Sequence, residues 1–115
     1  LARYMQILSK DFIDHYQNPI INIHHSFLPS FKGANPNKQA LERGVKIIGA
    51  TTHFVTEGLD EGPIIQQAVR SITHKDTIGS IKAKSKVLEK NTLAETITLF
   101  SQRRIVRHEN KTVIF

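Results

Sequence analysis

The segment IINIHH, residues 20–25, ends a short apolar run with side chains that can take part in catalysis. Because side chains alternate along a strand, Asn22 and His24 point to one face and His25 points to the other. An amide can donate a hydrogen bond to a developing oxyanion, and an imidazole can transfer a proton near neutral pH. The same spacing also fits an Asn22 that caps a turn beside a His24 that only packs, so both interpretations stay open.

Asp60 is a second candidate and lies in the segment GLDEGP, residues 58–63, between two expected strands. The flanking Gly58 and Gly62 let the backbone turn sharply around it. A carboxylate at this place can hold a water or fix the tautomer of an imidazole, although an ordinary turn aspartate fits equally well. His53 lies inside an apolar strand, where a histidine is more often a packed core residue than a catalyst.

The elements that must position these residues follow from turn residues and hydrophobic spacing. Ser9 caps a short helix, Pro36 begins a second helix that Gly44 ends, and Asp76 or Thr77 caps a long third helix. We expect helix, strand, helix, strand, strand, helix and hairpin over residues 9–16, 20–23, 36–43, 45–55, 64–72, 77–102 and 104–115.

This order predicts an α/β protein with a parallel strand near the start and antiparallel strands later. In the long helix, the spacing predicts an apolar stripe that faces the sheet. Its expected members are Ile78, Ile81, Val87, Leu88, Leu93, Ile97, Leu99 and Phe100.

Composition narrows the function classes. The 115 residues include no cysteine, which excludes disulfides and thiolate metal sites and fits a reducing compartment, so we expect a cytoplasmic location. No apolar run reaches the ~20 residues of a membrane span. The histidine spacing predicts no metal site, and no glycine-rich phosphate loop is present. The net charge of +6 leaves a nucleic-acid binder as an alternative, but the charge is scattered and most simply describes a solvated helix face.

Two longer segments carry a family resemblance: NIHHSFLPSFKGANP from Asn22, and QALERGVKIIGATTHFVTEGLDEGPII from Gln39. Together they contain Asn-x-His with a proline turn, His-Phe-Val and Asp-x-Gly-Pro in that order. The chain therefore resembles the formyltransferase family that uses 10-formyltetrahydrofolate. The resemblance implies a Rossmann-like formyltransferase fold with a mixed parallel and antiparallel sheet. Residues 1–115 would form the C-terminal part of the catalytic domain, preceded by a Rossmann half and an ACT-type regulatory domain.

The resemblance also implies roles for individual residues. Asn22, His24 and Asp60 correspond to the family's catalytic asparagine, histidine and aspartate, and His53 corresponds to a secondary active-site histidine. The folate would lie between the segment Met5, Gln6, Ile7 and Leu8 and the loop Thr56, Glu57, Gly58 and Leu59.

The His24–His25 doublet resembles the hydrolytic branch of the family, which splits 10-formyltetrahydrofolate into formate and tetrahydrofolate. We expect no permanently bound cofactor, a folate and water as partners, no nucleic acid or membrane, and a homo-oligomer. Formyl transfer to glycinamide ribonucleotide and a non-catalytic folate-binding fragment are the alternatives.

Overall fold

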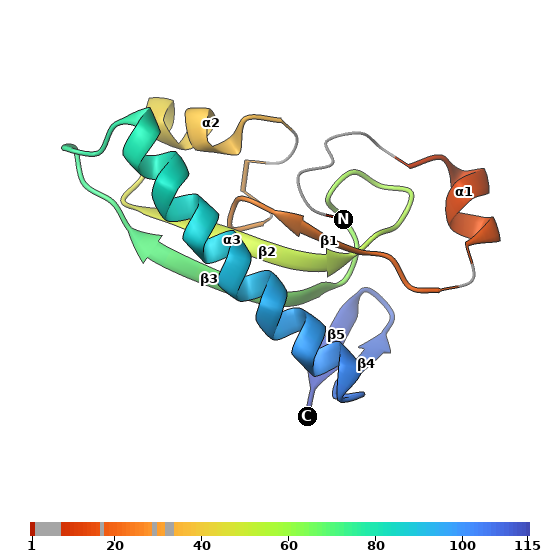
Figure 1. Cartoon of the computed structure of the whole chain (residues 1–115). Coiled ribbons are helices and arrows are strands. Elements are labelled where there is room, and N and C mark those ends of the chain that lie inside the picture. The colour runs from red at the N-terminus through yellow and green to blue at the C-terminus, as the bar shows by residue number, and fades with distance from the viewer. Residues whose placement is uncertain (2–7, 17, 29, 32–33) are drawn as a thin grey trace.

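The computed structural model describes residues 1, 8–16, 18–28, 30–31 and 34–115. The elements occur in the predicted order (Figure 1). They are α1 (Lys10–His15), β1 (Ile21–His24), α2 (Pro36–Arg43), β2 (Ile47–Phe54), β3 (Ile64–Ser71), α3 (Ile78–Ser101), β4 (Ile105–His108) and β5 (Lys111–Ile114).

Local signals account for the helix ends. The Ser9 hydroxyl accepts a hydrogen bond from the Phe12 amide at 3.1 Å and so caps α1. Gly44 ends α2 in the left-handed conformation, with φ of 72°. Thr77 and Ser80 form a reciprocal capping box at the start of α3, in which each side chain accepts from the other's backbone amide.

β1, β2 and β3 form one sheet in that order, and β4 and β5 form a separate two-stranded ribbon. All described pairings are antiparallel, including β1 with β2. The expected parallel pairing of the first strand is therefore not made within the part of the chain that the structure describes. The sequence pattern of a short buried strand does not specify its direction, which is why the expectation failed.

The register between β2 and β3 contains a bulge. Thr52 pairs with Gln66 and His53 pairs with Ile64, so Ile65 is an extra residue on β3. Ile65 is buried, whereas Ile64 is exposed and lines a cavity. Without the extra residue, Ile65 itself would lie opposite His53. The bulge places Ile64 there instead, so that Ile65 is buried and Ile64 faces the cavity.

α3 crosses one face of the sheet diagonally (Figure 1). Ile81 and Leu99 are buried there, as predicted, but Ile78, Val87, Ile97 and Phe100 are 36–56% exposed. The apolar stripe was thus predicted too wide: Ile81, Leu88 and Leu99 lie on the inner face, but most of the other buried positions of that face are polar. Its other buried residues are Ser85, Glu89, Thr92 and Thr96.

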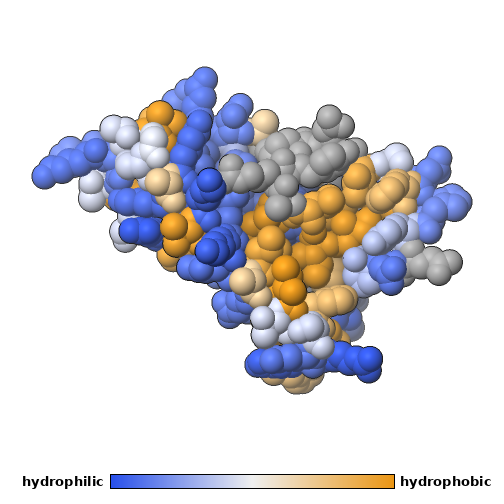
Figure 2. Space-filling model, in the orientation of Figure 1, coloured by the Kyte–Doolittle hydropathy of each residue, from blue (hydrophilic) through white to orange (hydrophobic). Residues whose placement is uncertain are grey.

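Apolar surface lies beside α3, over β1 (Figure 2). A cavity of about 660 Å³ belongs to this side and is lined by the chain start, α1 and the entry to β1. Phe12 and Tyr16 stack there with ring centroids 5.8 Å apart and are about half exposed.

Candidate active site

Four polar side chains share the face of the sheet that α3 does not cover. In the antiparallel register, Asn22 pairs with His53 and His24 pairs with Thr51. Directly opposite residues of such a pair point to the same side, and so do residues two apart on one strand. All four are buried. The common face predicted for Asn22 and His24 is therefore present, and it includes His53.

Asp60 reaches this group from the loop between β2 and β3. Its Oδ2 lies 3.5 Å from Nδ1 of His24, and its Oδ1 lies 3.8 Å from Nε2 of His53. The side chain is only 7% exposed, and its backbone adopts a left-handed φ of 53°. The carboxylate thus lies between two imidazoles, within one-water reach of each.

The path of this loop depends on Gly62. A Cβ placed on Gly62 would lie 1.6 Å from the carbonyl oxygen of Phe54, which no real contact allows. Next to it, the Phe54 amide donates to the carbonyl of Pro63 at 3.0 Å. The backbones of the loop and of β2 therefore pass so closely that only glycine fits, and this passage sets the position of Asp60.

His24 has a defined hydrogen-bond partner on the side away from Asp60. Its Nε2 lies 3.0 Å from the carbonyl oxygen of Phe31, which can only accept, so Nε2 carries a proton. In the neutral ring, the lone pair is then on Nδ1 and faces Asp60. A water that donates to both atoms, or a proton on Nδ1, satisfies this pair.

His53 is not a fully satisfied core residue. Its Nδ1 donates to the carbonyl of Phe54 at 3.0 Å, whereas Nε2 is buried without a hydrogen-bond partner among the described residues. Burial lowers the pKa of His53 below its ordinary value of 6.5, and this effect outweighs the opposing attraction of Asp60. At neutral pH, His53 is therefore an uncharged ring with a free lone pair directed at the site.

Asn22 has the same unusual property. Its Oδ1 is buried and has no hydrogen-bond partner within the described ranges. A half rotation of the amide exchanges Oδ1 and Nδ2, so the same point can present either an acceptor or a donor. Leaving such a group unpaired costs about 1–3 kcal/mol. Two unpaired polar atoms on one face indicate a site that a ligand or water completes.

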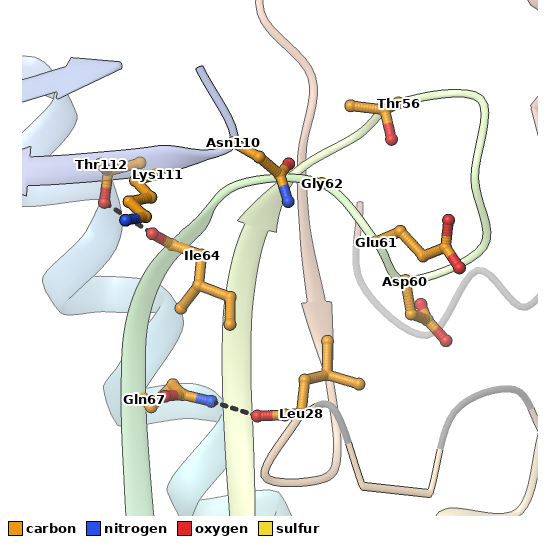
Figure 3. Close-up of a pocket in the computed structure, with 10 residues that line it drawn as sticks. All are labelled: Leu28, Thr56, Asp60, Glu61, Gly62, Ile64, Gln67, Asn110, Lys111 and Thr112. Atoms are coloured by element: carbon orange, nitrogen blue, oxygen red, sulfur yellow. Dashed lines mark hydrogen bonds between the residues drawn. The ribbon is translucent and has the colours of Figure 1, made fainter. Parts of the chain in front are cut away.

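A cavity of about 920 Å³ opens beside Asp60. Figure 3 shows Asp60, Glu61 and Thr56 on the loop side of it, and the hairpin residues Asn110, Lys111 and Thr112 on the other. Within the described part of the chain, no group of three His, Cys, Asp or Glu is placed to hold a metal ion. No described helix is both long and apolar enough to cross a bilayer.

The predicted folate-binding residues fall in several places. Met5, Gln6 and Ile7 lie outside the described residues. Leu8 lines the cavity beside α1, whereas Thr56 lines the cavity beside Asp60. Glu57 is exposed and lies 3.5 Å from Nζ of Lys10, which brings this loop next to α1. Gly58 is half-buried, and Leu59 is 38% exposed.

Two residues at the site were not singled out from the sequence. Thr51 pairs with His24 on one side and with Gln67 of β3 on the other, so the three side chains form one row across the sheet. Alternation along β2 places Thr51 on the same face as His53, and the register of β2 with β3 places Gln67 opposite Thr51. These two signals could have pointed to Thr51 and Gln67. The antiparallel pairing of β1, which the sequence did not indicate, was needed to connect them with His24.

Comparison with known proteins places this geometry in a family. A model of the family described as formyl transferase matches residues 1–97. The chain belongs to the formyl transferase family. Over its whole length it is 53% identical to the formyltetrahydrofolate deformylase of Bacillus subtilis, of which it covers 38%. The chain thus spans about two-fifths of the length of the relative that it matches.

Solved structures of the formyl transferase family confirm the α/β fold. A formyltetrahydrofolate deformylase from Pseudomonas syringae pv. tomato aligns with a TM-score of 0.92 at 50% identity, over 98% of this chain and 38% of that one. Glycinamide ribonucleotide transformylase 1 from Symbiobacterium toebii gives 0.91 at 39% identity, over 97% and 53%. The two structures share the fold with this chain, but the chain is more identical in sequence to the deformylase than to the transformylase.

Proposed function

We propose that the protein carrying this chain hydrolyses 10-formyltetrahydrofolate to formate and tetrahydrofolate. The observation that carries the proposal is the arrangement of Asn22 and His24 on one buried face, with Asp60 3.5 Å from His24 and with Oδ1 of Asn22 left without a hydrogen-bond partner among the described residues. The higher identity to deformylases than to the transformylase supports hydrolysis over formyl transfer.

In this mechanism, Asp60 accepts a hydrogen bond from the attacking water. The water oxygen forms a bond to the formyl carbon, and the electron pair of the carbonyl moves onto the formyl oxygen. Asn22 donates a hydrogen bond to that oxygen as negative charge develops on it. The proton released by the water passes to Nδ1 of His24, the ring nitrogen that faces Asp60.

The second step breaks the bond between the formyl carbon and N10 of the folate. The carbonyl double bond re-forms, and the leaving nitrogen takes the proton that His24 holds. Asp60 stabilises the imidazolium between the two steps, because its carboxylate lies 3.5 Å from the charged ring. His53, uncharged at neutral pH, contributes an acceptor for a second water at the site.

The proposal extends to the setting of the reaction. The partners are a folate and water, with no permanently bound cofactor and no nucleic acid, and the folate lies between residues 5–8 and 56–59. We propose that the protein is a cytoplasmic homo-oligomer. The formate that it releases would supply one-carbon metabolism and purine synthesis. Formyl transfer to glycinamide ribonucleotide is the second candidate, and the structural likeness to the transformylase is the observation behind it.

Substitution of Asp60 tests the mechanism. Asp60→Asn keeps the side-chain shape and removes the charge, so formate release should fall by roughly 10²-fold or more. Folate affinity, measured on the same variant of the full-length protein, should stay within a few-fold. A second measurement separates hydrolysis from formyl transfer: a hydrolase releases formate steadily when no acceptor amine is present, and a transferase does not. If turnover survives while affinity collapses, Asp60 is only a folate-loop residue and the mechanism is wrong.

A further inference from the structure

The hydroxyl of Thr51 makes every hydrogen bond that a hydroxyl can make. It donates to the carbonyl of Ser26 at 2.7 Å, and it accepts from the amide of Leu28 at 3.1 Å and from Nε2 of Gln67 at 3.2 Å. One donor and two lone pairs are thereby all used. Thr51 is fully buried, so water cannot replace any of these partners.

Gln67 strengthens the same attachment. Its Nε2 also donates to the carbonyl of Leu28 at 2.9 Å (Figure 3). The two hydrogens of one amide nitrogen therefore reach Thr51 and Leu28. Side chains from β2 and β3 together hold the backbone of residues 26–28, which directly follows β1 and the His24–His25 doublet.

The held segment leads back to His24. The Ser26 hydroxyl donates to the carbonyl of Ser30 at 2.6 Å, and the Ser30 amide donates to the carbonyl of Phe27 at 3.0 Å. Phe31 follows with a left-handed φ of 53°, and its carbonyl accepts from Nε2 of His24. The described residues of this stretch, 26–28 and 30–31, are here called the His24 turn. They begin at the Thr51–Gln67 pair and end on the imidazole.

We infer that Thr51 and Gln67 are positioning residues that fix the tautomer of His24 through the His24 turn. The inference rests on the proposed function, in which Nδ1 of His24 accepts the proton of the attacking water. That role requires the ring hydrogen on Nε2, where the Phe31 carbonyl holds it. If the turn shifts, Nε2 loses its acceptor, and the hydrogen is better placed on Nδ1, donating to Asp60. Nδ1 can then no longer accept a proton.

Thr51→Val tests this inference in the full-length protein. Valine keeps the size and branching of threonine but leaves the carbonyl of Ser26 and the amide of Leu28 without their partner. We expect kcat for formate release to fall by roughly 10- to 100-fold, with KM within threefold, because a small misplacement of a catalytic group has this effect. Thr51→Ser restores the hydroxyl and should return kcat to within about threefold of the original.

Thr52→Val is the matched control. Thr52 is also fully buried and hydrogen-bonded, but it points to the opposite face, where its hydroxyl meets that of Thr96 at 2.6 Å. The substitution should lower stability by a similar amount and leave kcat within about twofold. Equal losses of kcat in the Thr51 and Thr52 variants would overturn the inference, because general destabilisation would then explain both.

The tautomer is measured directly by nitrogen NMR of labelled histidine, in Gln67→Met as well as in Thr51→Val. Gln67 is half-buried at the cavity, so its replacement preserves the fold if the Thr51 variant does not. We expect the His24 hydrogen on Nε2 in the unsubstituted protein and a share on Nδ1 in both variants. An unchanged tautomer in both overturns the inference. Unchanged formate release in Asp60→Asn overturns the proposed role of Asp60 instead, and an unsubstituted protein that releases no formate overturns the proposed function, whatever the tautomer shows.

Discussion

The two faces of the β1–β3 sheet are both polar at their centre, but they treat their polar groups differently. On the face that α3 covers, Thr52 meets the Thr96 hydroxyl at 2.6 Å and accepts from the Gln66 amide at 3.1 Å, and Thr96 donates to the Thr92 carbonyl at 2.9 Å. Each hydroxyl has its partners. On the other face, Asn22 and His53 each keep one buried atom without a partner among the described residues.

This difference separates structural from functional polarity. A satisfied network costs little and fixes how a helix sits on a sheet. An unsatisfied buried group costs about 1–3 kcal/mol, which is a sizeable part of the stability of a small domain. In the proposed mechanism, the unpaired groups of the site face are the ones that bind substrate and water. Substitutions of the unpaired groups on the site face and of the paired groups on the helix face should therefore give opposite patterns of activity and stability.

The largest effect is expected from Gly62→Ala on the site face. The added methyl would collide with the Phe54 carbonyl and displace the loop that carries Asp60. Formate release by the full-length protein should fall by roughly 10³-fold, as for loss of a general acid–base group. Gly79→Ala, in the first turn of α3, is the control, because its new methyl meets only the Thr77 hydroxyl oxygen at an ordinary 3.6 Å. Full activity in Gly62→Ala would show that the passage does not position Asp60.

Asn22→Leu should lower activity strongly without a cost in stability. Loss of an oxyanion donor lowers kcat by roughly 10²- to 10³-fold. Because the substitution also removes an unpaired buried oxygen, the free energy of unfolding should stay the same or rise by about 1 kcal/mol. Urea unfolding and formate release are measured on the same preparation. A fall in the free energy of unfolding by more than about 1 kcal/mol would mean that Asn22 has a structural partner.

Thr96→Val should give the reverse pattern on the helix face. It removes the acceptor of the Thr52 hydroxyl, whose remaining acceptor, the Gln66 carbonyl, is 3.5 Å away. The free energy of unfolding should fall by about 1–2 kcal/mol, with kcat within about twofold. A loss of activity larger than the loss of folded protein would remove the contrast between the two faces.

The smallest effect concerns the pH dependence of stability. Because burial lowers the pKa of His53, the unfolded chain binds a proton near pH 6.5 that the folded protein does not bind. Stability from this group is complete above pH 6.5 and is lost as the pH falls through 6.5 toward the lowered folded value. His53→Gln should therefore flatten the fall in unfolding free energy below pH 6.5, measured by urea titrations at several pH values. An identical slope in both proteins would contradict this assignment.

Turn residues and spacing predicted the order of all the elements, because caps such as Ser9 and Gly44 act locally. Alternation along β1 likewise placed Asn22 and His24 on one face. The direction of β1 and the polar positions on the buried face of α3 were not predictable in this way, since both depend on partners distant in sequence. The Thr51–Gln67 pair was missed for the same reason, because it exists only once β2 and β3 are in register, and its connection to His24 needs β1 in register as well.

The bulge at Ile65 bears on how this region can change in evolution. Surface loops commonly tolerate insertions and deletions. Here, removal of Ile64 would place the buried Ile65 opposite His53, in the position that the exposed Ile64 now occupies, and pull the 55–63 loop along the sheet. We therefore expect homologous sequences that keep the site to vary in residue identity here but not in length between Phe54 and Gln66.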